Sequence, residues 1–203
     1  IYQRMLGIRP DMTVQVERIA CTRLANEPRP LRLSYAGQVL RVKSSQLRPE
    51  RQLGQAGIEL IGSNSTASDC EVVLLSAKTL EKIGVKNLSV DLGLPAFVPA
   101  LFADLNIDTK TQEDLRIALD RKDAASVKAL GAQGIDLFAT LLDCVGPADS
   151  AIKTLSSLSL SGHACTLRDE LVAVYKLISL QAPSLTLTVD PVENRGYEYH
   201  TVV

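Results

Sequence analysis

Residues 55–59 (Gln-Ala-Gly-Ile-Glu) alternate in a way that is typical of a β-strand with two different faces. In a strand, residues two apart point to the same face, so Gln55 and Glu59 project together with Gly57 between them. Because glycine has no side chain, we predict open space for a ligand over Gly57. An amide and a carboxylate beside that space predict a recognition site for a molecule the size of an amino acid.

The strand belongs to a predicted hairpin. Residues 31–35 alternate apolar and polar side chains, and an extended pattern resumes at residues 39–42 after an interruption that we expect at Gly37. This places Arg41 on one arm of the hairpin and the Gln55 and Glu59 pair on the returning strand, residues 53–61. A segment close to the C-terminus, residues 195–200 (Arg-Gly-Tyr-Glu-Tyr-His), is expected to converge on the same pocket.

Composition excludes several classes of protein. The chain of 203 residues is 46% hydrophobic and 22% charged, with a net charge of -1 and no tryptophan. Nucleic-acid binders usually carry a basic face and aromatic platforms, so no nucleic-acid partner is expected. No apolar run approaches the roughly 20 residues that cross a bilayer, so no membrane partner is expected either.

The four cysteines, Cys21, Cys70, Cys144 and Cys165, are widely scattered and form no CxxC pair. Disulfide frameworks and zinc sites need closer grouping or histidine partners, so we expect buried free thiols in a reducing cytoplasm. Neither a metal nor a cofactor is expected.

The order of elements predicts an α+β fold, an antiparallel β-sheet flanked by helices, over one domain at residues 1–203. Residues 95–160 show successive short helical patterns without a strand, and we interpret them as a small helical insertion. The mixed charges of residues 116–123 indicate a solvated helix end without a binding role. The chain lacks an initiator methionine and stops within a predicted strand at residues 195–203, so we expect a piece of a longer protein.

Three segments, residues 5–13, 51–62 and 192–201, carry a resemblance to a known family. In order and spacing they resemble the histidyl-tRNA synthetase-like class II synthetase fold. The chain is more similar still to the ATP phosphoribosyltransferase regulatory subunits, which are paralogues of that synthetase. Each segment alone is weakly specific, but together they extend the resemblance over nearly the whole chain.

The resemblance implies a histidine pocket. In the synthetase an acidic residue and a threonine hold the α-amino group, and here these positions are Asp11 and Thr13. A glutamine and a glutamate contact the amino acid, which implies the same for Gln55 and for Glu59 at the imidazole. The resemblance also implies that Arg195, Tyr199 and His200 belong to this pocket. Arg41 occupies the position of an arginine that reaches the α-phosphate of ATP in the synthetase.

The chain also departs from the synthetase pattern. The synthetase loop has a glutamate that helps to bind adenine, and here Lys43 takes its place, followed by Ser44 and Ser45. His200 stands at the position where the family has a second tyrosine. The resemblance therefore implies a non-catalytic regulatory subunit that binds L-histidine, with Arg41 as a vestigial phosphate contact.

By the same resemblance, this subunit would assemble with the short-form catalytic subunit of ATP phosphoribosyltransferase and mediate histidine feedback on the first step of histidine biosynthesis. A homodimer is expected, and residues 95–160 are a candidate surface for the catalytic subunit. Two alternatives stay open. One is a histidyl-tRNA synthetase catalytic core, which would join histidine to ATP and then to tRNA. The other is a synthetase-like sensor outside histidine biosynthesis.

Overall fold

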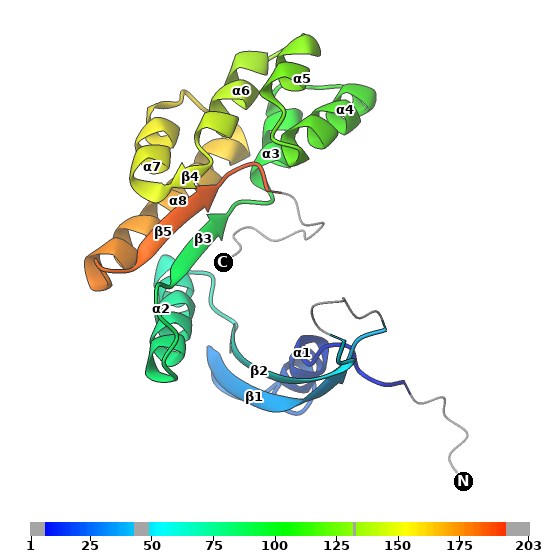
Figure 1. Cartoon of the computed structure of the whole chain (residues 1–203), viewed down its shortest axis with the longest axis vertical. Coiled ribbons are helices and arrows are strands. Elements are labelled where there is room, and N and C mark those ends of the chain that lie inside the picture. The colour runs from blue at the N-terminus through cyan, green and yellow to red at the C-terminus, as the bar shows by residue number, and fades with distance from the viewer. Residues whose placement is uncertain (1–6, 43–48, 132, 194–203) are drawn as a thin grey trace. The chain divides into compact units, whose positions relative to one another are not determined.

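The computed structural model describes residues 7–42, 49–131 and 133–193. The chain divides into two compact units, unit 1 at residues 1–68 and unit 2 at residues 69–203 (Figure 1). The single domain predicted over the whole chain stays a prediction.

Unit 1 is a two-stranded antiparallel ribbon with one helix packed on it. Strands β1 (Leu31–Leu40) and β2 (Gln52–Ile61) pair along their full lengths, and α1 (Thr13–Cys21) lies on one face (Figure 1). Side chains alternate between the two faces, as the sequence predicted: the even-numbered positions of β1 are exposed and the odd-numbered ones are at least partly buried. The small apolar core of the unit consists of Met12, Val16, Ala20, Leu31 and Val39.

The predicted interruption at Gly37 is wrong, because β1 runs unbroken and pairs Gly37 with Gln55. Glycine is needed here for a different reason. A Cβ at this position would lie 2.6 Å from a guanidinium nitrogen of Arg9 and 3.0 Å from the sulfur of Met12. The absent side chain therefore lets the segment before α1 approach the sheet closely.

Unit 2 is built on a small mixed sheet with strand order β3-β5-β4. β3 (Ser89–Gly93) pairs with β5 (Thr186–Asp190) in parallel, and β4 (Gly146–Pro147) pairs with β5 antiparallel. The α+β class is confirmed, while the parallel pairing was not predicted. β4 also corrects the expectation that residues 95–160 contain no strand.

Helices lie beside and behind this sheet in the view of Figure 1. The predicted succession of short helices between residues 95 and 160 is confirmed, and a further helix follows β4. The helices of unit 2 are α2 (Thr66–Lys82, which begins at the end of unit 1), α3 (Phe97–Asp104), α4 (Thr109–Asp120), α5 (Ala124–Ala129), α6 (Ile135–Asp143), α7 (Ala148–Ser157) and α8 (Gly162–Gln181).

The core of unit 2 is apolar and closely packed. Helix α8 shows why: its buried residues recur every three or four positions, so one stripe of the helix faces the interior. The rings of Phe102 and Phe138, both almost fully buried, pack with their centroids 5.5 Å apart. The buried stripe of α8 comprises Ala164, Leu167, Leu171, Val174 and Ile178.

Candidate functional site

Four of the predicted site residues belong to one continuous hydrogen-bonded network in unit 1, on the face of the ribbon that carries α1. They are Asp11, Thr13, Gln55 and Glu59. Gln55 is at the centre of this network. Its amide nitrogen donates to Oδ2 of Asp11 at 2.8 Å, and its amide oxygen accepts from the backbone N–H of Met12 at 2.9 Å. The sequence predicted that the Gln55 amide flanks a space for a ligand. In the structure the same side chain braces the segment that carries Asp11.

The second half of the network connects Thr13 to Glu59. The hydroxyl groups of Thr13 and Tyr35 lie 3.0 Å apart, and the Tyr35 hydroxyl donates to Oε1 of Glu59 at 3.2 Å. Since the tyrosine proton is directed to the carboxylate, the Thr13 hydroxyl is the donor in the first contact. Thr13, Tyr35 and Glu59 are each partly buried. The network therefore fixes one carboxylate oxygen of Glu59, and no hydrogen bond between residues that the structure describes engages the other, Oε2.

The predicted open space over Gly57 is occupied. Tyr35 pairs with Gly57 across the ribbon, and a Cβ at Gly57 would lie 2.4 Å from both Cζ and Oη of the tyrosine. The prediction was wrong because it considered one strand alone. In an antiparallel pair, a large side chain covers the residue directly opposite. Gly57 therefore makes room for Tyr35.

Tyr35 is the residue that the sequence analysis missed. It connects Thr13 with Glu59 although neither is adjacent to it in sequence. A signal was present in the alternation of residues 31–35. Once β1 and β2 are paired in the observed register, Tyr35 must share a face with Gln55 and Glu59.

Electrostatics keeps Asp11 ionised. The pKa of this carboxyl is lowered from its ordinary value of 3.8, first by the backbone N–H of Thr13 at 2.7 Å and then by the amide of Gln55. Partial burial opposes these effects, and the positive charge of Arg41 adds a smaller lowering contribution. Arg41 thus lies near enough to Asp11 to act on it, from an exposed position just beyond β1.

Tyr35 stays protonated. The hydrogen bond from Thr13 acts to lower the pKa of Tyr35, but burial and the negative charge of Glu59 outweigh it, and the net pKa is raised. A protonated phenol is required for its donation to Glu59. The predicted site residues Arg195, Tyr199 and His200, and also Lys43, lie outside the described residues.

Several other predictions have outcomes in the structure. The mixed charges of residues 116–123 are not all solvated, because Nζ of Lys122 contacts both carboxylate oxygens of the buried Asp190 at 2.8 and 2.7 Å. All four cysteines are free thiols as predicted. Cys70 and Cys144 are buried, but Cys21 is exposed and Cys165 is partly exposed.

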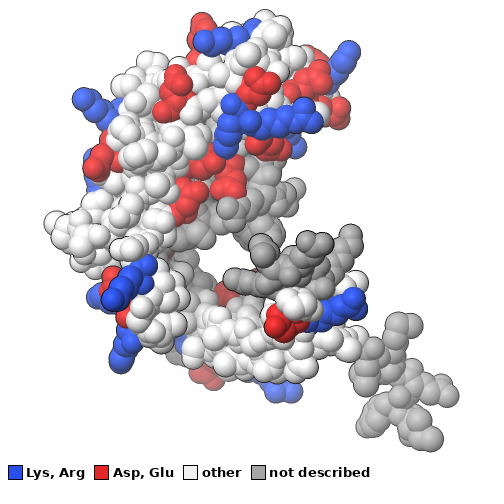
Figure 2. Space-filling view, viewed as in Figure 1, with Lys and Arg blue, Asp and Glu red and all other residues white. Residues whose placement is uncertain are grey.

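The surface of the described residues can be compared with the expectations from charge and composition. On the face drawn in Figure 2, acidic and basic side chains are interspersed over the described part of unit 2. Among the described residues, none of the helices has the length and apolarity needed to cross a bilayer. The same part of the chain holds no group of three or more histidine, cysteine, aspartate or glutamate side chains that could bind a metal ion.

With this fold and network established, the chain can be placed in a family. The model of the histidyl-tRNA synthetase family matches residues 2–203, and the chain belongs to this family. Its fold is the class II synthetase-like fold of that family.

Within the family, the chain is similar to regulatory subunits. It is 56% identical to the ATP phosphoribosyltransferase regulatory subunit of Paramagnetospirillum magneticum over 199 residues, which cover 98% of this chain and 52% of the relative. The chain therefore spans about half the length of this relative. A solved structure from Bacillus halodurans, described as an ATP phosphoribosyltransferase regulatory subunit/histidyl-tRNA synthetase, matches with a TM-score of 0.80 and 26% identity over 95% of this chain and 52% of that one.

A second solved structure is a complex. It is the ATP phosphoribosyl transferase (HisG:HisZ) complex from Thermotoga maritima, matched with a TM-score of 0.70 over 92% of this chain and 65% of that one. At 16% identity this likeness supports the fold.

Proposed function

We propose that this chain is part of a non-catalytic regulatory subunit of ATP phosphoribosyltransferase and that unit 1 binds L-histidine. The observation that carries the proposal is the network in which Asp11, Thr13 and Glu59 are all anchored on one face of the ribbon. The names of the similar relatives support the regulatory role and the place in histidine biosynthesis.

The geometry suits the two ends of histidine. The carboxylate of Asp11 is ionised and can accept further hydrogen bonds at both oxygens, so it suits an α-ammonium group, with the Thr13 hydroxyl beside it. Oε2 of Glu59 suits an imidazole N–H or an imidazolium, and Tyr35 holds this carboxylate in place through Oε1. By the family resemblance, Arg195, Tyr199 and His200 would complete the pocket.

The regulatory role follows from what the chain keeps and what it has lost. Apart from His200, which replaces a tyrosine, the residue types implied for the histidine pocket are present, whereas Lys43 stands where the synthetase has an adenine-binding glutamate. Arg41 is then a vestigial phosphate contact. Histidine feedback on the short-form catalytic subunit requires that histidine bind the inhibited assembly more tightly than the active one. A homodimer of the regulatory subunit is part of the same proposal.

Isothermal titration calorimetry on the full-length protein tests the histidine site. We expect L-histidine to bind and Glu59→Gln to weaken binding by about tenfold or more, because hydrogen bonds to charged groups contribute about 1.5–3 kcal/mol. Glu50→Gln is the matched control, since it is the same substitution at an exposed residue of unit 1, and it should leave the affinity unchanged.

A titration with ATP separates the alternatives. Histidine binding without ATP binding supports the sensor. Binding of both, with formation of histidyl-adenylate, would overturn the regulatory proposal in favour of a histidyl-tRNA synthetase core. Absence of histidine binding would overturn the histidine site. If histidine binds but a pull-down with the short-form catalytic subunit fails, the protein is a sensor outside histidine biosynthesis.

A further inference from the structure

The two carboxylates of the network in unit 1 are engaged to different degrees. Oδ1 of Asp11 accepts from the backbone N–H of Thr13 at 2.7 Å, and Oδ2 accepts from the Gln55 amide at 2.8 Å. The carboxylate of Glu59 has a single hydrogen-bond donor within the described part of the chain, the neutral phenol of Tyr35 at 3.2 Å. The charge of Glu59 is therefore less compensated than the charge of Asp11.

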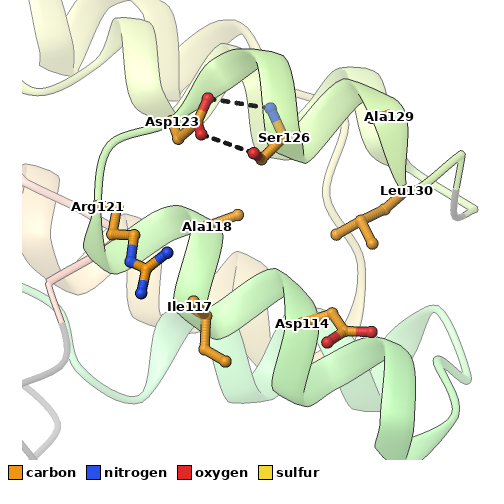
Figure 3. Close-up of a pocket in the computed structure, with 8 residues that line it drawn as sticks. All are labelled: Asp114, Ile117, Ala118, Arg121, Asp123, Ser126, Ala129 and Leu130. Carbon is orange, nitrogen blue, oxygen red and sulfur yellow. Dashed lines mark hydrogen bonds between the residues drawn. The ribbon is translucent and has the colours of Figure 1, made fainter.

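Asp123 in unit 2 shows the structural task of a carboxylate that is engaged at both oxygens. It lies beside the hollow between α4 and α5 (Figure 3). One oxygen accepts from the backbone N–H groups of Ala125 and Ser126 and the other from the Ser126 hydroxyl, so Asp123 caps α5. Glu59 is a partly buried strand residue without such a task. A carboxylate in this position costs free energy unless a partner compensates its charge.

The cations around the network engage other groups. Arg9 and Arg29 donate to backbone oxygens at 2.8 and 3.0 Å, and the charge of Arg41 acts on Asp11. None of the ion pairs that the described residues form among themselves includes Glu59. The other titratable residues of the two elements packed against β2 are exposed: Glu17, Arg18 and Cys21 on α1, and Arg32 on the opposite face of β1.

The hydroxyl of Tyr35 reports a negative electrostatic field beside Glu59. The hydrogen bond from Thr13 acts to lower the pKa of Tyr35, but burial and the negative charges of Glu59 and Asp11 raise it. A ligand ring that contacts Glu59 experiences the same two charges. Nearby negative charge stabilises the protonated form of an imidazole, whose ordinary pKa is about 6.5.

Two forms of the histidine ring can donate to Glu59. A neutral imidazole supplies one N–H group, whereas an imidazolium supplies two and carries a positive charge. Hydrogen bonds with an ionised donor or acceptor are roughly twice as strong as neutral ones, and a charge on both partners adds their Coulomb attraction. Because the described residues give Glu59 only a neutral donor, the imidazolium is its better partner.

We propose that the site in unit 1 binds histidine with its imidazole protonated, so that binding strengthens as the pH falls from 8 to 6. This inference rests on the proposed function for the identity of the ligand. Glu59 selects the protonated ring, while Asp11 and Thr13 hold the α-ammonium group. Histidine feedback then responds to pH as well as to the concentration of histidine.

Isothermal titration calorimetry on the full-length protein at pH 6 and pH 8 compares L-histidine with 2-fluoro-L-histidine. The fluorine withdraws electrons from the ring, so this ligand keeps a ring N–H group but stays neutral over the whole range. If binding raises the ring pKa by one unit, L-histidine should bind about sixfold more weakly at pH 8 than at pH 6. Titration of the α-amino group, or of protein side chains such as His163 and His200, affects both ligands alike.

Proton uptake provides a second measurement on the unmodified protein. A ring whose pKa is raised on binding takes up protons, and a rise from about 6.5 to about 7.5 predicts an uptake of about 0.4 proton at pH 7.5. Titrations in two buffers with different ionisation enthalpies measure this uptake. We expect it for L-histidine in excess of the fluorinated ligand.

Two variants locate the effect. Glu59→Gln should remove the pH dependence that distinguishes L-histidine from the fluorinated ligand, whereas Glu50→Gln, at an exposed residue, should keep it. If L-histidine binds with the same pH dependence as the fluorinated ligand, or if Glu59→Gln keeps the difference, the inference is overturned while the proposed function stands. If L-histidine does not bind at either pH, the proposed histidine site and the inference fail together.

Discussion

Unit 1 and unit 2 differ in what holds their interiors together. On the α1 face of the ribbon in unit 1, polar side chains are hydrogen-bonded to one another beside a core of a few apolar residues. In unit 2 the interior is filled by three phenylalanines and many aliphatic side chains, most of them less than 2% exposed. Lys122 and Asp190 form a polar contact at the edge of this apolar unit.

The two interiors contribute different physical properties to the protein. Apolar burial is non-directional and contributes about 25 cal/mol per Å², so unit 2 gains stability without a fixed arrangement of donors and acceptors. A hydrogen-bonded network contributes less net free energy, but its directional contacts restrict the orientations of the Asp11 and Glu59 carboxylates. A recognition site needs the second property more than the first.

The largest effect is expected in the apolar core. Phe138→Ala should lower the free energy of unfolding by about 3–5 kcal/mol, because it leaves a cavity against Phe102. Urea denaturation measures this change, and Leu180→Ala, at a residue that is 79% exposed, is the control with an expected change below about 0.5 kcal/mol. Equal losses for the two variants would show that unit 2 does not depend on its buried rings.

In unit 1, Gly57→Ala tests the packing of Tyr35. The new Cβ would lie 2.4 Å from the tyrosine ring, so we expect a loss of about 1–3 kcal/mol from overpacking. The loss should largely disappear in a Tyr35→Ala background, where the space is free. A double-mutant cycle by urea denaturation measures the coupling, and additive losses would contradict the observed contact.

The ion pair between Lys122 and Asp190 tests how much a polar contact stabilises the otherwise apolar unit 2. Lys122→Met removes the partner of a carboxylate that is 9% exposed, and we expect a loss of about 1–3 kcal/mol. The value should stay below that of a fully buried pair because the Lys122 side chain is 38% exposed. Asp190 also accepts from the backbone N–H of Val192, so Asp190→Asn reports on both contacts. A Lys122→Met variant as stable as the wild type would show that solvent replaces the ammonium group.

The smallest effect is a pH dependence in unit 1. The pKa of Asp11 in the folded state is below its ordinary value of 3.8, so folding favours the ionised form. This contribution is complete above pH 3.8 and is lost as the pH falls through the folded pKa. Asp11→Asn should therefore flatten the acid limb of the stability curve, with little change in its slope above pH 5. If the free energy of unfolding fell equally steeply at acidic pH in the wild type and in Asp11→Asn, the folded state would not favour the ionised form of Asp11.

The sequence by itself determined the features that depend on local periodicity and on ordered motifs. Alternation predicted that Gln55 and Glu59 share a face, and the order of three weak motifs predicted the family. The short helices of residues 95–160 were also predicted, because their apolar positions repeat with the period of a helix.

The tertiary structure alone decided which side chains meet. The space over Gly57 is filled by Tyr35 because the register of the ribbon places the two opposite each other. Lys122 contacts Asp190, which is 68 residues away in the sequence. Strands β3 and β5, which are also distant in the sequence, pair in parallel. Periodicity specifies the face to which a residue points, whereas its partner depends on strand register and on the approach of distant segments. Only the folded chain fixes these.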